Sequence, residues 1–362
     1  MRTWVIRWTT WRRRLLFVAV MSAIGVLFCA PQAAQNGVRH GLAVCAQLLV
    51  PSLFPFLVIA GFLVKGGFLQ SLGRRAEPLM RWAFGFGGNA AGAILLSMIG
   101  GYPAGATAVV GLLQNGDIDR GSAKRLLRVT VHAGPAFVIG GIGVGMLHSV
   151  EAGLLLLGAH LLSSLIVMGI ERRPSSPVPL TRQPPLSLGR AVTDSVHDAT
   201  KALLSMCGFV LLASAALSLV DALSGDLSPH PWWRCLLSCV TEVSTGCLEA
   251  CGMGAAAPFW IGATLGFGGL SVCGQIAAVT AGHGLLDRGF WRVRLLHALL
   301  GGTLSALLFS GFPPKKIAVD AVAIATSAFH EQHPSIAFTA LLALMLLCVL
   351  FLQTLPSARR GE

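Results

Sequence analysis

The sequence predicts an all-α polytopic membrane protein with two inverted repeats and broken helices or re-entrant hairpins, in about 8–10 membrane segments. Hydrophobic residues make up 54% of the chain and charged residues only 12%, whereas soluble domains carry about 25% charged residues. The net charge is +12, and the basic residues lie in short loops between apolar spans, as orientation signals do. We therefore expect a lipid bilayer around the chain and no nucleic-acid partner.

Two glycine-interrupted apolar segments repeat each other 168 residues apart, at Gly100-Gly101 and Gly268-Gly269. Each pair is followed at the same distance by G-x-x-D-R-G, at 116–121 and 284–289. Interrupted segments at matching positions of two halves point to the substrate site of a transporter. Chance is the alternative, because 43 of the 362 residues are glycine. The shared Asp-Arg-Gly in one register favours a duplicated fold.

The chain divides into five parts in this interpretation. These are an N-terminal anchor span or cleaved signal segment (1–40), a first repeat (41–170), a Pro/Ser-rich basic cytoplasmic linker (171–200), a second repeat (201–312), and a C-terminal loop with a last span (313–362). Counting alternate crossings makes the repeats inverted. The same count places Arg288, Arg292 and Arg294 outside, against the positive-inside tendency.

Prolines and glycines predict where helices are interrupted. Pro51, Ser52 and Pro55 lie in the span 41–64, which we expect to break in mid-membrane. Residues 82–113 suit a re-entrant hairpin, and Gly134-Pro135 adds another break near a span at 129–147. Further expected elements are a span at 152–170, a surface helix at 190–200 and spans at 202–222, 295–312 and 335–355.

The first hairpin tip is a candidate substrate site, formed by Gly100, Gly101, Tyr102 and Pro103. Glycine allows positive φ and proline has no N–H, so exposed N–H groups and the next helix N-terminus can hold an anionic or polar substrate. Close helix packing through small residues is the alternative.

The second tip contains Gly268, Gly269, Ser271 and Gln275. Ser271 and Gln275 are four residues apart, so one helix would project both polar groups together. They serve either the substrate or interhelical hydrogen bonds.

Glu242 lies in an apolar segment, followed by Thr245 and Gly246. An acid in this setting is expected to be a proton carrier, cation ligand or substrate anchor. Glu249, seven residues on, would share its helix face, and pairing with a Lys or Arg is the alternative for Glu242. We expect Asp119 and Asp287 to be helix N-caps, and His132 to be a buried, hydrogen-bonded histidine.

Enzymatic chemistry has no support in the sequence, which contains no nucleophile elbow, phosphate-binding loop or HExxH pattern. Cys235/Cys239 and Cys247/Cys251 each repeat at i, i+4, but no histidine accompanies them at ligand-like spacing. We expect no metal and no cofactor.

Several motifs resemble those of the YlbJ/SpoVV-type sporulation integral membrane proteins, from about residue 41 to 310. They are PSLFPF (51–56), GGYPAGA (100–106), AGPAFVIGGIGVGM (133–146), TEVSTGC (241–247) and GFGGLSV (266–272). That family carries two nucleoside-recognition (Gate) domains and is similar to concentrative nucleoside transporters. The chain departs from it at Val131–Pro135, where relatives usually read Asn-Asn-Ser-Gly-Pro, and at Cys273-Gly274-Gln275, where they often show His-Ala-Gln.

The resemblance implies a protein of the outer forespore membrane that moves dipicolinic acid from the mother cell toward the spore. Two alternatives stay open, a carrier of nucleosides or other small metabolites and a non-transporting membrane scaffold of sporulation. The sequence also leaves open a homo-oligomer.

Overall fold

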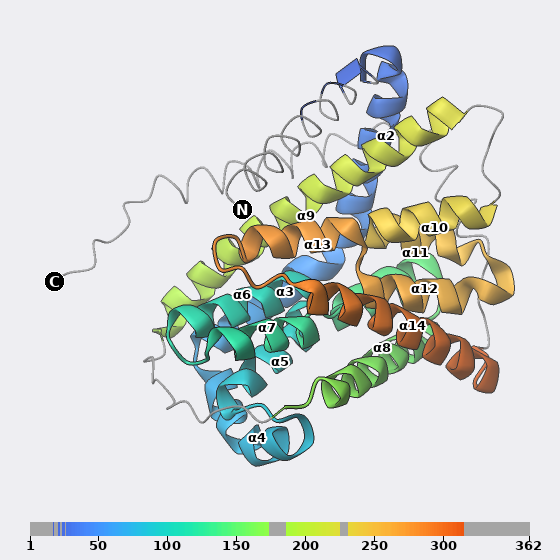
Figure 1. Ribbon diagram of the computed structural model, residues 1–362. Coiled ribbons are helices and arrows are strands. Elements are labelled where there is room, and N and C mark those ends of the chain that lie inside the picture. The colour runs from blue at the N-terminus through green and yellow to red at the C-terminus, as the bar shows by residue number, and fades with distance from the viewer. Residues whose placement is uncertain are drawn as a thin grey trace, which may run out of the picture.

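A computed structural model describes residues 30–173, 186–224 and 231–314, with scattered positions between 17 and 29. Every regular element in these ranges is a helix (Figure 1). The all-α prediction is confirmed.

Within the described residues, five helical stretches are long and apolar enough to cross a membrane. They are Pro31–Leu63, Val150–Ile170, Leu188–Leu223, Gly254–Val279 and Arg288–Gly311. Ala90–Gly100 and Ala136–Met146 are shorter apolar helices. These lengths and compositions support a multi-pass membrane protein. The expected last span, 335–355, lies outside the described residues.

The first long helix does not break at its prolines, so that expectation was wrong. α2 (Pro31–Val44) continues through the π-helical turn η1 (Cys45–Leu49) into α3 (Val50–Lys65), which contains Pro51 and Pro55. A proline removes one i→i−4 hydrogen bond, and a π-turn beside it lets the helix absorb the change. The Ser52 hydroxyl donates to the Leu48 carbonyl at the start of α3.

α9 (Leu188–Ser224) is one continuous helix. The expected surface helix at 190–200 and the span at 202–222 are therefore a single element. α9 packs along α2 and α3 (Figure 1), and Gly37 allows the approach, because a Cβ there would lie 2.7 Å from the Cα of Ala215. Most of the expected linker, at 174–185, lies outside the described residues.

The first half continues with α4 (Phe68–Phe84), α5 (Gly88–Gly100), α6 (Tyr102–Gln114), α7 (Arg120–Val129), η2 (Ala136–Met146) and α8 (Val150–Ile170). α5 and α6 are separated only by Gly101, whose φ is 80°. Residues 131–134 are not helical, so the expected span 129–147 is interrupted at Gly134, as its Gly-Pro pair predicts.

The second half contains α10 (Pro231–Thr241), α11 (Val243–Cys251), η4 (Gly254–Ala256), α12 (Ala257–Phe267), α13 (Gly269–Val279) and α14 (Arg288–Gly311). α12 ends at Gly268 and α13 begins at Gly269, with φ values of 85° and 75°. Each half thus interrupts a helix at the repeated glycine pair. The inverted relation of the halves and the five-part division stay predictions.

Both aspartates of the repeated motif cap helices, as predicted. Asp119 accepts hydrogen bonds from the N–H groups of Gly121 and Ser122 at the start of α7. Asp287 accepts from the N–H of Phe290 at the start of α14. α14 then packs against α12 and α8, and this places residues of the second half beside residues of the first.

Candidate functional site

The two helix breaks meet inside the protein. The Tyr102 hydroxyl donates to the Leu265 carbonyl at 2.8 Å, one turn before the break at Gly268. A Cβ at Gly268 would lie 3.5 Å from the Tyr102 ring, and Tyr102 is buried. The carbonyls in the last turn of α12 lack helical partners, and Tyr102 supplies a donor to one of them. The expected tips at Gly100–Pro103 and Gly268–Gln275 are therefore brought together.

Each break also packs against another non-helical backbone. A Cβ at Gly134 would lie 3.0 Å from the Ile99 carbonyl oxygen and 3.3 Å from the Gly101 nitrogen. On the other side, a Cβ at Gly269 would lie 3.1 Å from the Cα of Glu242. Helices are thus interrupted at four adjoining places, which brings polar backbone into a buried layer.

Glu242 is the N-cap of α11, and only 1% of it is exposed. Its carboxylate accepts from the Thr245 N–H at 2.7 Å. Glu249 lies within α11 and forms an ion pair with Arg234 at 3.2 Å. The expectation that the two acids share a helix face was wrong, because the helix begins only after Glu242.

Two hydroxyl groups, those of Ser244 and Thr245, interact with the Glu242 carboxylate. The side-chain oxygens of Ser244, Thr245 and Ser271 are all buried. Gly246 packs against α10, and a Cβ added at Gly246 would lie 2.6 Å from the Cα of Cys239. Ser271 and Gln275 are both buried on α13, so the structure places them on one helix as predicted.

Arg294 is among the largest fully buried side chains in the described part of the chain, and the sequence interpretation placed it outside the membrane. It lies within α14 and donates to the Val131, Gly266 and Arg128 carbonyls at 2.7, 3.2 and 3.0 Å. These carbonyls belong to the end of α7, the interrupted segment after it and the end of α12. Because α7 and α12 both stop nearby, their last carbonyls are free to accept, and Arg294 joins the two halves through them.

Three buried histidines lie beside Arg294. The His160 and His297 rings stack at 4.8 Å between centroids, and the His132 ring lies 6.1 Å from each. His132 is hydrogen-bonded to the Ser164 hydroxyl at 2.6 Å, which confirms its expected buried role. Among the described residues, no group of three or more His, Cys, Asp or Glu side chains is arranged to hold a metal ion.

Several polar atoms of this group have no hydrogen-bond partner. They are the Arg294 Nε, the His160 Nδ1 and one ring nitrogen of His297, whose other nitrogen interacts with the His160 backbone. His160 Nε2 accepts from the Ala133 N–H at 3.0 Å, so the proton of its neutral ring is on Nδ1. Leaving a buried donor unpaired costs about 1–3 kcal/mol, and this cost calls for an explanation.

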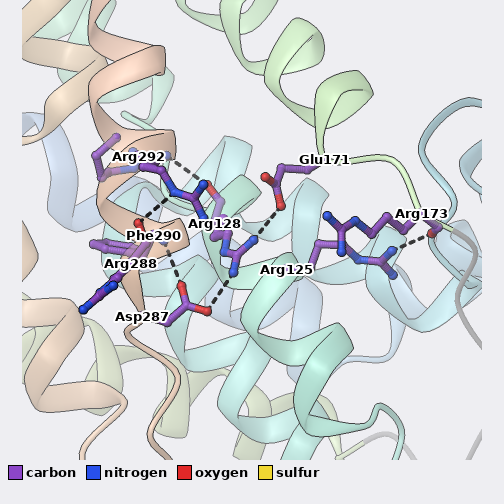
Figure 2. Close-up of polar contacts among 9 residues, drawn as sticks. Arg125, Arg128, Glu171, Arg173, Asp287, Arg288, Phe290 and Arg292 are labelled. Carbon is purple, nitrogen blue, oxygen red and sulfur yellow. Dashed lines mark hydrogen bonds and ion pairs between the residues drawn. The ribbon is translucent and has the colours of Figure 1, made fainter.

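An ion-pair network joins the halves at the start of α14 (Figure 2). Arg128 donates to Glu171 at 2.8 Å and to Asp287 at 2.7 Å. Nearby, Arg125 donates to the Arg173 carbonyl at 2.6 Å. Asp287 therefore serves both as a helix cap and as the acid that holds α7 to α14.

The predicted helix breakers lie at two different places. Gly134 and Pro135 adjoin the break at Gly101. Ser52 faces η2, where a Cβ at Gly140 would lie 3.6 Å from its Cβ.

Sequence reasoning missed Arg294, His160 and His297. A charged residue and two histidines within apolar stretches were the available signal. Arg294 was counted with the loop arginines, since it follows Arg288 and Arg292 closely.

Comparison with known proteins gives one informative relative. The sporulation integral membrane protein YlbJ of Bacillus subtilis (strain 168) is 27% identical over 321 residues, and the match covers 77% of this chain and 78% of that protein. The similarity supports the YlbJ-type family assignment. The similarity to this integral membrane protein and the apolar helices together support a multi-pass membrane protein. No protein-family model matches the chain, and no solved structure does.

Proposed function

We propose that this protein is a carrier in the outer forespore membrane that moves a small anionic metabolite, dipicolinic acid, from the mother cell toward the forespore. The sporulation relative supports the biological setting. We propose the transport activity and the substrate from the buried layer in which the helix breaks meet.

The observation that carries the proposal is the junction of Tyr102 with Leu265 at 2.8 Å. Interrupted helices deep in a membrane protein are tolerated where their backbone is buried in protein or lines a cavity. Carriers use such matched interruptions to bind substrate between two halves. A scaffold has no comparable use for them.

The charge of the site favours an anion. Arg294 is a buried cation whose partners are carbonyl groups, so its positive charge is not cancelled by them. Dipicolinate is a planar aromatic dicarboxylate, so each of its carboxylates is a suitable partner for a guanidinium group.

Reconstitution in liposomes tests the transport class directly. Purified protein in vesicles that contain Tb³⁺ should give a growing chelate luminescence when dipicolinate is added outside, while protein-free vesicles should not. Uptake of labelled uridine instead of dipicolinate would favour the nucleoside alternative. A protein that moves neither compound would favour the scaffold.

Deletion in a sporulating host tests direction and place. Spores of the deletion strain should contain little dipicolinate while their mother cells retain it. Normal spore dipicolinate would contradict the proposal, and loss from both compartments would point to a defect in synthesis.

A further inference from the structure

We infer that Arg294, His160 and His297 form a binding site for a carboxylate group of the transported anion. The inference rests on the proposed function and adds to it where the substrate's negative charge is held. It assigns this role to residues of α8 and α14 rather than to the glycine pairs.

The donors of this group are available to a ligand. Arg294 uses both of its terminal nitrogens on carbonyls, while its Nε–H has no partner. His160 has a protonated Nδ1 without an acceptor, because Nε2 already accepts from Ala133. One ring nitrogen of His297 interacts with the His160 backbone, and its other nitrogen has no partner.

The donors form one group. His160 and His297 stack at 4.8 Å, and His297 lies one turn after Arg294 on α14. The charge of Arg294 acts on all three histidines. One nitrogen of the His297 ring is directed at the His160 backbone, which fixes the ring beside His160.

The chemistry selects a carboxylate over a neutral or cationic ligand. All the unpaired groups on Arg294 and His160 are N–H donors, and guanidinium matches carboxylate in geometry and charge. A buried positive charge also opposes a metal ion or another cation. Arg294, His132, His160 and His297 contribute no carboxylate of their own, so an incoming anion meets no like charge within this group.

The surroundings suit a position between the two halves. Arg294 donates to Val131 in the first half and to Gly266 in the second. His160 belongs to α8 and His297 to α14, which pack against each other. An anion held here therefore contacts both repeats, as a carrier substrate must if its passage depends on their relative movement.

The test uses full-length protein in detergent and dipicolinate as the probe, with affinity measured by titration calorimetry. His297→Phe keeps an aromatic ring against His160 and removes both ring nitrogens. We expect dipicolinate to bind about tenfold more weakly or worse, and the melting temperature shows whether the fold is kept. His297→Gln retains an N–H donor and should recover part of the affinity.

The matched control is His283→Phe, in the loop before α14, whose histidine is hydrogen-bonded to Gln114. Its affinity for dipicolinate should equal that of the wild type. If His297→Phe binds dipicolinate as tightly as the wild type does, the inference is overturned. Because the wild type still binds dipicolinate in that case, the proposed function would stand. If the wild type binds isophthalate or benzoate but not dipicolinate, the same comparison is made with that carboxylate. Binding of none of the three would contradict both proposals.

A second measurement does not depend on folding of the phenylalanine variant. Wild-type protein with ¹⁵N-labelled histidine should show a shifted imidazole signal on addition of dipicolinate, assigned to His297 by its absence in His297→Gln. A spectrum in which dipicolinate binds and no signal of His160 or His297 moves would overturn the inference.

Discussion

The Tyr102 hydroxyl is hydrogen-bonded to the Leu265 carbonyl across 163 residues of sequence. The bond joins the N-terminus of α6 to the last turn of α12, so each interrupted helix stabilises the end of the other. The bond therefore depends on tertiary packing and not on the local sequence around either residue.

Tyr102→Phe should lower the stability of the protein by about 1 kcal/mol, because the Leu265 carbonyl loses a buried donor. Dipicolinate uptake should fall as well, since the junction of the breaks is loosened. Thermal melting and liposome uptake measure the two effects. Wild-type uptake in this variant would show that the bond has no part in transport.

Gly105→Ala should destabilise the protein by about 1–3 kcal/mol or more. A Cβ there would overlap the Thr130 carbonyl and lie 2.6 Å from the Ser97 Cβ. Gly111→Ala is the matched control in the same helix, because nothing lies within 4 Å of its Cβ, and alanine favours helix. Melting temperatures of the two variants compare them. A tolerated Gly105→Ala would refute the close packing of α6 on residue 130.

Glu242→Gln should retain stability and lose transport. The amide oxygen of glutamine can accept from the Thr245 N–H as the carboxylate does, so the cap survives while the charge is lost. Glu242→Ala should in addition lower stability by about 1 kcal/mol through loss of the cap. Protein level, melting and uptake separate the variants. Full uptake by Glu242→Gln would exclude a role for the charge.

Asp287→Asn should lower stability by about 1 kcal/mol near neutral pH, because the cap to Phe290 is retained and the ion pair with Arg128 is lost. Asp119→Asn is the matched control, since Asp119 occupies the same motif position and its hydrogen bonds are to Gly121 and Ser122. Chemical unfolding of both variants should show the larger loss for Asp287→Asn.

The difference between wild type and Asp287→Asn should depend on pH. Partial burial alone would raise the pKa of Asp287, but hydrogen bonds from Arg128 and Phe290 outweigh it and hold that pKa below its usual value. The stabilisation is therefore present above the unfolded-state pKa of about 3.9 and is lost as pH falls through the lower folded value. Unfolding measured between neutral and acidic pH checks the direction. A gap that widens on acidification would contradict the assignment.

The sequence allowed prediction of features that depend on local chemistry. Composition predicted the all-α membrane fold, and glycine pairs predicted the breaks at Gly101 and Gly268. The Asp-Arg-Gly motif predicted the caps at Asp119 and Asp287. The breaks and the caps each depend on residues within one turn of the feature itself.

Features that depend on tertiary contacts were missed or wrong. Pro51 was expected to break a helix, because the compensating π-turn beside it has no clear sequence signal. Arg294 was counted among loop arginines, since its carbonyl partners Val131 and Arg128 are more than 160 residues away. His160 and His297 are brought together only by the packing of α8 on α14.

The close approach of α12 and α14 limits how the protein can move. A Cβ at Gly301 would lie 2.7 Å from the Gly262 carbonyl oxygen, and one at Gly302 would lie 2.9 Å from that of Phe259. Backbones in such contact cannot slide past each other without losing their packing. We expect these two helices to travel as one rigid body in any transport cycle, and its hinges to lie at their ends.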